Sequence, residues 1–98
     1  MALEIVWTKR ADKKFDAILN YLLTDWGTNV TTNFVRKTHH VVELLSEYPE
    51  MGSMEHKKNG IYGFTIVKQI NVFYRVSGTQ LIVLNFFDNR QNPQVKKY

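Results

Sequence analysis

The sequence predicts an α+β fold in which two helices pack on one face of an antiparallel sheet. Two observations carry this prediction: apolar residues recur at spacings of three and four between residues 8 and 48, and three β-rich runs follow between residues 61 and 87. A short strand is expected before the helices, because Leu3, Ile5 and Trp7 alternate with their neighbours. Residues 1–98 have the length of a single domain with one hydrophobic core.

The two helices are expected to form a hairpin. Thr8 can cap the first helix, Gly27 can end it, and Thr28 or Asn29 can cap the second helix, which Pro49 stops. The apolar stripes are Ala11, Phe15, Ile18, Leu19, Leu22 and Trp26 in the first helix, and Val30, Phe34, Val41, Leu44, Leu45 and Tyr48 in the second.

The strands are expected over Ile61–Lys68, Ile70–Val76 and Gln80–Phe87, joined by short turns into a sequential meander. Residues Glu50–Gly60 show little periodicity and are expected to form a loop. One face of the sheet should carry the helices, and the opposite face should be more polar. In the middle run Ile70, Val72, Tyr74 and Val76 point to one face, and Asn71, Phe73 and Arg75 point to the other.

The composition indicates a cytoplasmic protein with a mildly basic surface. The chain contains no cysteine, which excludes disulfides and thiolate chemistry. No apolar run approaches the roughly 20 residues that span a membrane, and the N-terminus lacks the pattern of a signal peptide. The net charge is +4, with seven Lys/Arg against three Asp/Glu in residues 49–98. This excess favours an anionic partner, although a surface charged only for solubility explains it equally well.

Three places in the sequence supply the candidate binding residues. Arg90 follows the last β-rich run, and its planar guanidinium suits a phosphate or a carboxylate; pairing with Asp88 or Glu55 is the structural alternative. Arg75 lies two residues from Phe73 on the open face, where a cation beside an aromatic ring can hold a nucleotide or make an ordinary cross-strand contact. The compact basic patch in the expected loop, suited to nucleic acid or simply solvated, consists of His56, Lys57 and Lys58.

Other conspicuous residues favour structural roles. Trp7 and Trp26 flank the first helix and are expected at the edge of the core, where they also suit a groove for a partner. His39 and His40 diverge by about 100° on a helix and cannot share a metal ion. Because no phosphate loop, nucleophile elbow or metal-ligand spacing occurs, no cofactor and no metal are expected.

Several segments, taken in order and covering nearly the whole chain, carry a resemblance to a known family. These segments are Ile5-Val-Trp-Thr8, Ile18-Leu-Asn-Tyr-Leu22, Trp26-Gly27, Leu44-Leu-Ser-Glu-Tyr-Pro-Glu-Met-Gly52, Val72-Phe-Tyr-Arg-Val76 and Phe87-Asp-Asn-Arg-Gln-Asn-Pro93. They resemble the RelE/ParE superfamily of bacterial toxins, which includes plasmid stabilisation proteins. The resemblance implies an α+β toxin of a type II toxin–antitoxin module, silenced by a cognate acidic antitoxin that would contact Trp7, Trp26 and Phe73.

The activity that the resemblance implies depends on single residues. RelE-like toxins cut messenger RNA on the ribosome with basic side chains on the open sheet face, whereas ParE-like toxins poison DNA gyrase. Arg90 matches the arginine at the end of the last strand of the ribonucleases. Asn71 stands where they place a second arginine, Tyr62 and Phe64 stand where they place lysines, and Tyr98 lies only near the position of their catalytic tyrosine.

Most of the ribonuclease set is therefore missing, which favours a gyrase-directed toxin. One alternative is a ribosome-dependent endoribonuclease in which Arg90 and Arg75 act catalytically, and another is a non-toxic protein-binding member of the family. The residues expected to bind the target are His56, Lys57, Lys58, Lys68, Asn71, Arg90 and Tyr98.

Overall fold

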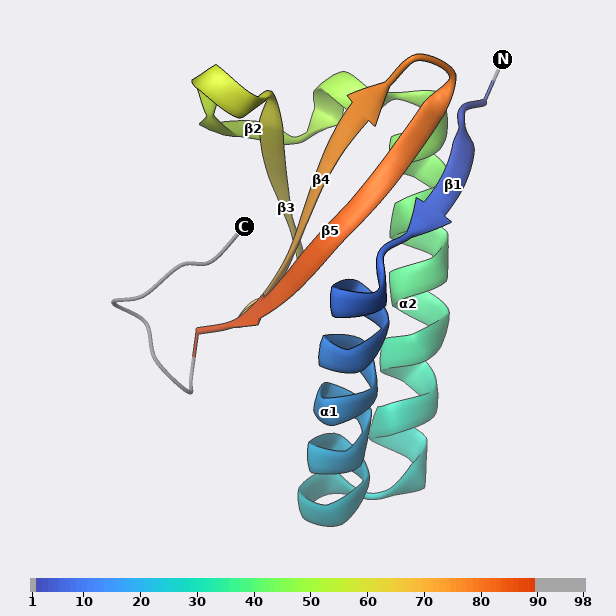
Figure 1. The fold of residues 1–98 in the computed structure, drawn as a ribbon. Helices are drawn as coiled ribbons and strands as arrows, with labels where there is room; N and C mark the ends of the chain where they lie inside the picture. Colours follow the sequence, from blue (N-terminus) through green and yellow to red (C-terminus); the bar gives the residue numbers. More distant parts are fainter. Residues whose placement is uncertain (1, 90–98) are drawn as a thin grey trace.

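The computed structural model describes residues 2–89, which form two layers: a sheet and a helical hairpin (Figure 1). The predicted order of elements is confirmed: a strand, two helices and then three consecutive antiparallel strands. The elements are β1 (Glu4–Trp7), α1 (Lys9–Trp26), α2 (Thr28–Glu47), β2 (Ser53–His56), β3 (Ile61–Val67), β4 (Ile70–Ser77) and β5 (Gln80–Asp88). No helix in this part of the chain is both long and apolar enough to cross a membrane.

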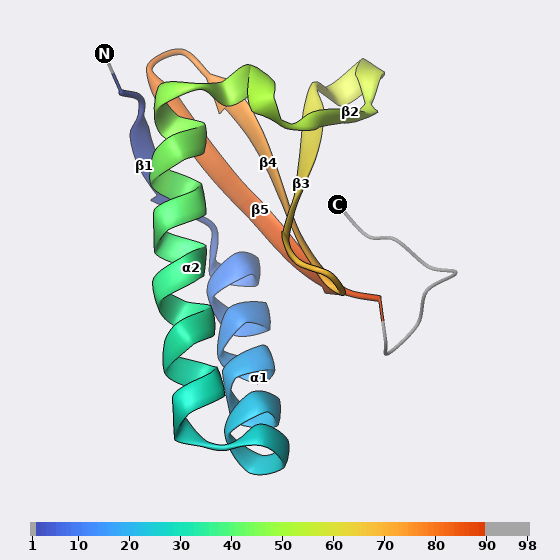
Figure 2. The same cartoon turned by 180° about the vertical axis from the view of Figure 1, so that it is seen from behind.

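The sheet has five strands in the order β1-β5-β4-β3-β2. The meander is antiparallel as predicted, but β1 pairs with β5 in parallel, so the complete sheet is mixed. This pairing joins the two ends of the described chain, with Glu4 opposite Gln80. Figure 2 shows both helices on one side of the sheet. The sheet therefore buries one face against the helices and leaves the opposite, open face on the other side.

The start of α1 is fixed to the sheet through Thr8. As predicted, its hydroxyl caps the helix, because Oγ1 accepts a hydrogen bond from the N–H of Ala11 at 3.1 Å. The same oxygen lies 3.1 Å from the carbonyl oxygens of Val83 and Leu84, to which it can donate.

The prediction that Thr28 or Asn29 caps the second helix is wrong. The helix α2 begins directly after Gly27, which is its N-cap and makes no side-chain hydrogen bond.

The expected loop Glu50–Gly60 is more regular than predicted. It contains the edge strand β2 between two 3₁₀ turns, Pro49–Met51 and Lys57–Asn59. The sequence of β2, Ser-Met-Glu-His, has no alternation of apolar and polar residues, so it does not predict a strand. β2 is an edge strand that pairs only with β3.

The hydrophobic core lies between the sheet and the helices. Ile18 and Leu45 from the helices pack with Val72, Tyr74 and Phe86 of the sheet. Not every residue of the predicted apolar stripes is buried: Trp26 is 60% exposed and Val30 is 42% exposed, both beside the turn between the helices. Tyr48 is also exposed at the end of α2. The outer turns of the helical hairpin therefore extend beyond the sheet that buries their inner turns.

Candidate functional site

The open face of the sheet is less polar than predicted. Phe73 has no exposed surface and forms a second apolar cluster with Ile61 and Phe87, against which Leu84 packs. Its neighbour Tyr74 is equally buried, but in the main core. The open face, predicted to be more polar than the helix side, therefore also contains an apolar cluster around Phe73, and the side chain of Phe73 offers no exposed surface to a partner in this structure.

A β-bulge at Leu84 sets which side chains of β5 reach the open face. Phe73 lies opposite Asn85 and Tyr74 lies opposite Val83, so Leu84 is an extra residue in β5. The bulge keeps Val83 and Phe86 in the main core and places Leu84 against the open-face cluster. The hydroxyl of Thr8 contacts the carbonyl of Leu84 at the same place.

The open face carries one groove with two cations. It has a volume of about 510 Å³ and is lined by Lys58, Asn59, Ile61, Arg75 and Leu84. We call this the basic groove. Arg75 is exposed on β4, and Lys58 comes from the 3₁₀ turn before β3, so the groove brings together two of the residues predicted from the sequence. Its apolar floor and its two cations suit an anionic group attached to an apolar or planar body.

The turn that carries Lys58 is shaped by its own backbone and by His56. The Nδ1 atom of His56 accepts a hydrogen bond from the N–H of Asn59 at 3.3 Å. Gly60 has a φ of 65° and donates its N–H to the carbonyl of Lys57 at 3.2 Å. This left-handed conformation favours glycine and returns the chain directly into β3. His56 therefore stabilises the turn that carries Lys58, but it does not itself line the basic groove.

Tyr74 fixes the segment that leads to β2. Its hydroxyl accepts a hydrogen bond from the N–H of Gly52 at 3.1 Å and donates one to the carbonyl of Pro49. Burial raises the pKa of Tyr74 to about 12, although the hydrogen bond from Gly52 opposes the shift. The phenol therefore stays protonated at neutral pH and holds the turn before β2 against β4. Sequence analysis treated Tyr74 as an apolar core residue and missed this polar contact.

Asn71 lies in a separate hollow on the open face. This hollow is lined by Ser53, Glu55, Gly63, Thr65 and further residues, and the Thr65 hydroxyl lies 3.0 Å from Oδ1 of Asn71. Gly63 allows the close packing here, because a Cβ at this position would lie 2.9 Å from Cγ of Glu55 and 3.0 Å from the ring of Phe73. Asn71 is therefore not part of the basic groove.

The remaining predicted residues are dispersed. Lys68 is exposed in the turn between β3 and β4, at the opposite end of β4 from Arg75. Lys57 is exposed next to Lys58 but does not line the basic groove. Arg90 and Tyr98 lie outside the described residues. Within residues 2–89 no three His, Asp or Glu side chains are grouped to hold a metal ion.

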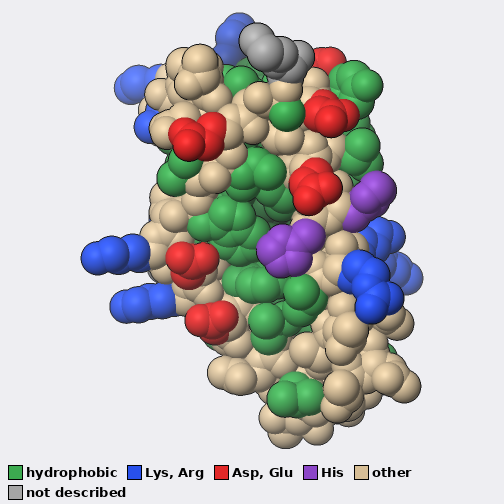
Figure 3. Space-filling view, turned by 90° about the vertical axis from the view of Figure 1, so that its right-hand side faces the viewer, with side chains coloured by type: hydrophobic (Ala, Val, Ile, Leu, Met, Phe, Trp, Pro, Cys, Tyr) green, Lys and Arg blue, Asp and Glu red, His purple; other side chains and the backbone are tan. Residues whose placement is uncertain are grey.

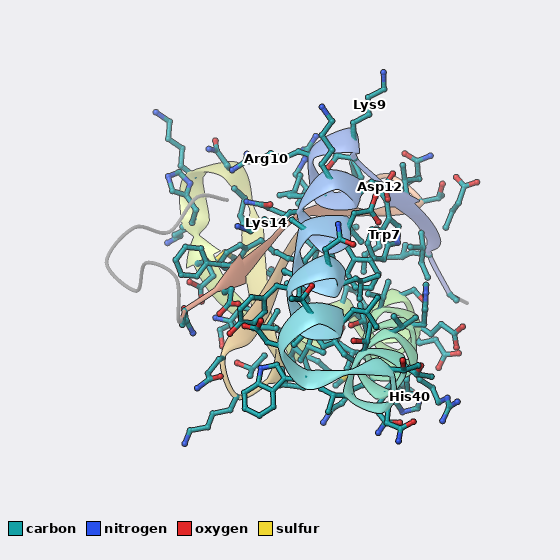
Figure 4. All side chains as sticks on the ribbon, turned by 90° about the horizontal axis from the view of Figure 1, so that it is seen from below. Trp7, Lys9, Arg10, Asp12, Lys14 and His40 are labelled. Carbon is teal, nitrogen blue, oxygen red and sulfur yellow. The ribbon has the colours of Figure 1, made fainter. Side chains whose placement is uncertain are left out.

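Trp7 belongs to an aromatic cluster at the edge of the core, as predicted. Its ring centroid lies 5.2 Å from those of Phe15 and Phe86 and 6.3 Å from that of His39. In Figure 3, which shows the side of the molecule on the right of Figure 1, apolar side chains form a band bordered by acidic side chains and histidines. Figure 4 shows Trp7 and Asp12 on one side of α1, and Arg10 and Lys14 on the other. The surroundings of Trp7 are therefore not uniformly basic.

The sequence matches the family model of the ParE toxin of the type II toxin–antitoxin system parDE over residues 5–93. No curated protein matches the chain by sequence.

Solved structures share the fold. A protein of the chromosomal ParDE system from P. aeruginosa superposes with a TM-score of 0.74 at 19% identity, over 89% of this chain and 96% of that one. The YoeB/ParE toxin from Agrobacterium tumefaciens gives 0.64 at 17% identity, over 88% and 98%. A chain of the RelBE2 toxin–antitoxin complex from Mycobacterium tuberculosis gives 0.62 at 13% identity, over 90% and 99%. The solved structures show the shared fold, and the family match over most of the sequence shows that this chain belongs to the ParE toxin family of type II toxin–antitoxin systems, within the RelE/ParE superfamily.

Proposed function

We propose that this chain inhibits growth by binding its target, DNA gyrase, and does not cut RNA. The observation that supports this proposal is the composition of the open sheet face. The positions of β3 and β4 that face this side are Ile61, Gly63, Thr65, Asn71, Phe73 and Arg75, so Arg75 is their single cation within the described residues. Cleavage of RNA without a metal requires a proton acceptor, cations that stabilise the phosphorane and a donor for the leaving oxygen.

Within residues 2–89, the ribonuclease positions inferred from the resemblance do not supply these groups either; Arg90, which matches one of these positions, lies outside these residues. Tyr62 pairs with Tyr74 and Phe64 pairs with Val72, so both side chains lie on the helix side of the sheet. An alignment shifted by one residue would instead match the lysine positions to Gly63 or Thr65, which do face the open side, but neither is a base or a cation. The missing cations are therefore not an effect of the register chosen for β3.

The basic groove is suited to binding. Arg75 and Lys58 offer several donors to a carboxylate or a phosphate, and Ile61 and Leu84 offer an apolar surface beside them. A complex of gyrase and DNA presents both kinds of anion. We further propose that the toxin works in the cytoplasm without a cofactor and that an acidic antitoxin neutralises it; the ParDE system and the RelBE2 toxin–antitoxin complex among the structural relatives support a partner of this kind.

The test is induced expression of the full chain without any antitoxin, combined with transcript mapping and a supercoiling assay with purified gyrase. We expect growth to stop while transcripts remain intact, and the purified chain to inhibit supercoiling. Reversal of both charges in the basic groove, Lys58→Glu with Arg75→Glu, should abolish inhibition. Arg36→Glu with Lys37→Glu, two exposed cations on α2, is the matched control and should remain inhibitory.

Two results would contradict the proposal. Early cleavage of ribosome-bound transcripts at defined codon positions, lost in Arg75→Ala, would identify a ribonuclease. Unchanged growth with abundant folded protein would identify a non-toxic binding protein.

A further inference from the structure

The first two turns of α1 carry a compact group of cations on the surface of the molecule. We call this group the α1 cations: Lys9, Arg10, Lys13 and Lys14. All of them are exposed except Lys14, which is half-buried. The same stretch contains two carboxylates, Asp12 and Asp16, so residues 9–16 carry a net charge of +2.

The helical period separates these charges onto different sides of α1. Lys9 and Lys13 are one turn apart and lie opposite the buried stripe of the helix. Arg10 and Lys14 are also one turn apart, and Figure 4 shows them on one side of α1 with Asp12 on the other. The cations therefore form a positive surface that the carboxylates border but do not interrupt.

The fold does not need cations at these positions. The first turns of a helix lie at the positive end of its dipole, which cations oppose. Like charges one turn apart also repel each other, and both Lys9 with Lys13 and Arg10 with Lys14 have this spacing. The helix is already capped by the hydroxyl of Thr8. The placement of these charges therefore opposes helix stability, which indicates a role in binding an anion.

The α1 cations begin next to the basic groove. Leu84 lines that groove, and its carbonyl oxygen lies 3.1 Å from the hydroxyl of Thr8, the residue before Lys9. β1 pairs with β5 only as far as Val83, so beyond this residue the edge of β5 borders α1. An extended anionic ligand can therefore contact both the α1 cations and Arg75 in the basic groove.

The surroundings favour a phosphate backbone over an acidic protein. Along the described chain the first large apolar side chain that is exposed is Leu23, so the α1 cations lack the apolar centre of a protein interface. Lysine is also depleted in protein interfaces, whereas lysine and arginine on phosphates provide most of the sequence-independent affinity for nucleic acids. Cations one turn apart, about 6 Å along the helix, can follow a row of phosphates.

We propose that the α1 cations bind the phosphate backbone of duplex DNA and, together with the basic groove, hold the toxin on the DNA that gyrase engages. The choice of DNA rests on the proposed function, but contact with a phosphate backbone does not require gyrase. Phosphate contacts carry no information about the base sequence, so the binding is independent of sequence.

The test measures binding of the purified full chain to a short fluorescent DNA duplex of arbitrary sequence by anisotropy at several salt concentrations. The logarithm of the association constant should fall linearly with the logarithm of the salt concentration, because bound counterions are released. Lys9→Gln with Lys13→Gln should weaken binding at least about tenfold at low salt and reduce the slope by about two. Arg36→Gln with Lys37→Gln, which removes the same charge from α2, is the matched control and should keep the slope of the wild type.

Thermal unfolding separates binding from folding. Lys9→Gln with Lys13→Gln should unfold at the temperature of the wild type or above it, because the variant removes charges that oppose the helix dipole. A lower unfolding temperature would show that these lysines stabilise the fold, and would overturn the inference.

Three binding results would also overturn the inference. The first is wild-type affinity and slope in Lys9→Gln with Lys13→Gln. The second is tighter binding of an RNA duplex of the same sequence, which would identify RNA as the ligand. The third is tighter binding of polyglutamate, which would identify an acidic protein.

Failure of this inference differs from failure of the proposed function. A chain that binds the duplex through the α1 cations but does not inhibit supercoiling by gyrase would overturn the proposed function and leave the DNA-binding surface. Equal inhibition of gyrase by the wild type and by Lys9→Gln with Lys13→Gln would overturn the inference and leave the proposed function.

Discussion

The hydroxyl of Tyr74 and the backbone of Gly52 fit together so closely that residue 52 has no room for a side chain. The hydroxyl accepts the N–H of Gly52 at 3.1 Å, and a Cβ at residue 52 would overlap it. The carbonyl of Gly63 lies 3.0 Å from the same Cβ position. This contact attaches the turn before β2 to the centre of the sheet, and through β2 it positions the turn that carries Lys58.

Removing the Tyr74 hydroxyl should therefore destabilise the protein. Tyr74→Phe keeps the ring but leaves the carbonyl of Pro49 and the N–H of Gly52 without this partner. The expected loss is about 1–3 kcal/mol in the free energy of unfolding, measured by urea denaturation. Tyr48→Phe removes a hydroxyl from an exposed tyrosine and should change stability by less than about 0.5 kcal/mol. Equal effects of the two changes would contradict the role given to Tyr74.

Gly52→Ala should destabilise the protein because the new methyl group displaces the Tyr74 hydroxyl. An overpacked site of this kind typically costs about 1–3 kcal/mol. The double variant with Tyr74→Phe should cost clearly less than the sum of the single changes, because both disrupt the same contact. Additive losses in urea denaturation would show that Gly52 and Tyr74 act independently.

Stability should fall at alkaline pH through Tyr74. Burial raises the pKa of Tyr74 from 10.0 to about 12 in the folded chain, so the folded state holds its proton more tightly than the unfolded state. This contribution is fully present below pH 10 and is lost as the pH rises towards 12. The wild type should therefore lose more stability over this window than Tyr74→Phe. Parallel pH curves for the two proteins would contradict the shift.

Thr8→Ala should cost about 1–2 kcal/mol, because the hydroxyl caps α1 and contacts the carbonyls of β5. Thr8→Ser should retain most of the stability. Thr28→Ala is the matched control, since Thr28 is exposed at the start of α2 and Gly27 occupies the N-cap position. The thermal unfolding temperatures of the three variants test this role: a drop for Thr8→Ala no larger than that for Thr28→Ala would contradict it.

The sequence determines the helices and the three consecutive strands because their side chains repeat with the period of each element. Apolar spacing in α1 and the β-rich runs of β3 to β5 need no knowledge of distant residues. β2 depends instead on its partner: Ser53 and Met54 are extended because they pair with Gly63 and Tyr62. A polar edge strand of this kind carries no periodic signal of its own.

The site is partly predictable for a similar reason. Lys58 and Arg75 are recognisable as cations in a turn and on an open face, but their presence in one groove follows from long-range pairing. The burial of Phe73 was not predictable by alternation, which places it on the polar face. It depends on Ile61 and Phe87 from neighbouring strands, which cover its ring. Loss of function in Phe73→Ala would therefore report on folding, since emptying a buried aromatic site costs about 3–5 kcal/mol.

The parallel pairing of β1 with β5 governs when the sheet can be completed during synthesis. Glu4 of β1 pairs with Gln80 of β5, so the sheet can be completed only after β5 has left the ribosome. The helical hairpin is built from local contacts, so it can form much earlier than the pairing of β5 with β1 and β4. Trp26 lies on that early-forming hairpin, whereas the basic groove needs residues of β3, β4 and β5 together. A nascent chain therefore exposes Trp26 before it has assembled the basic groove.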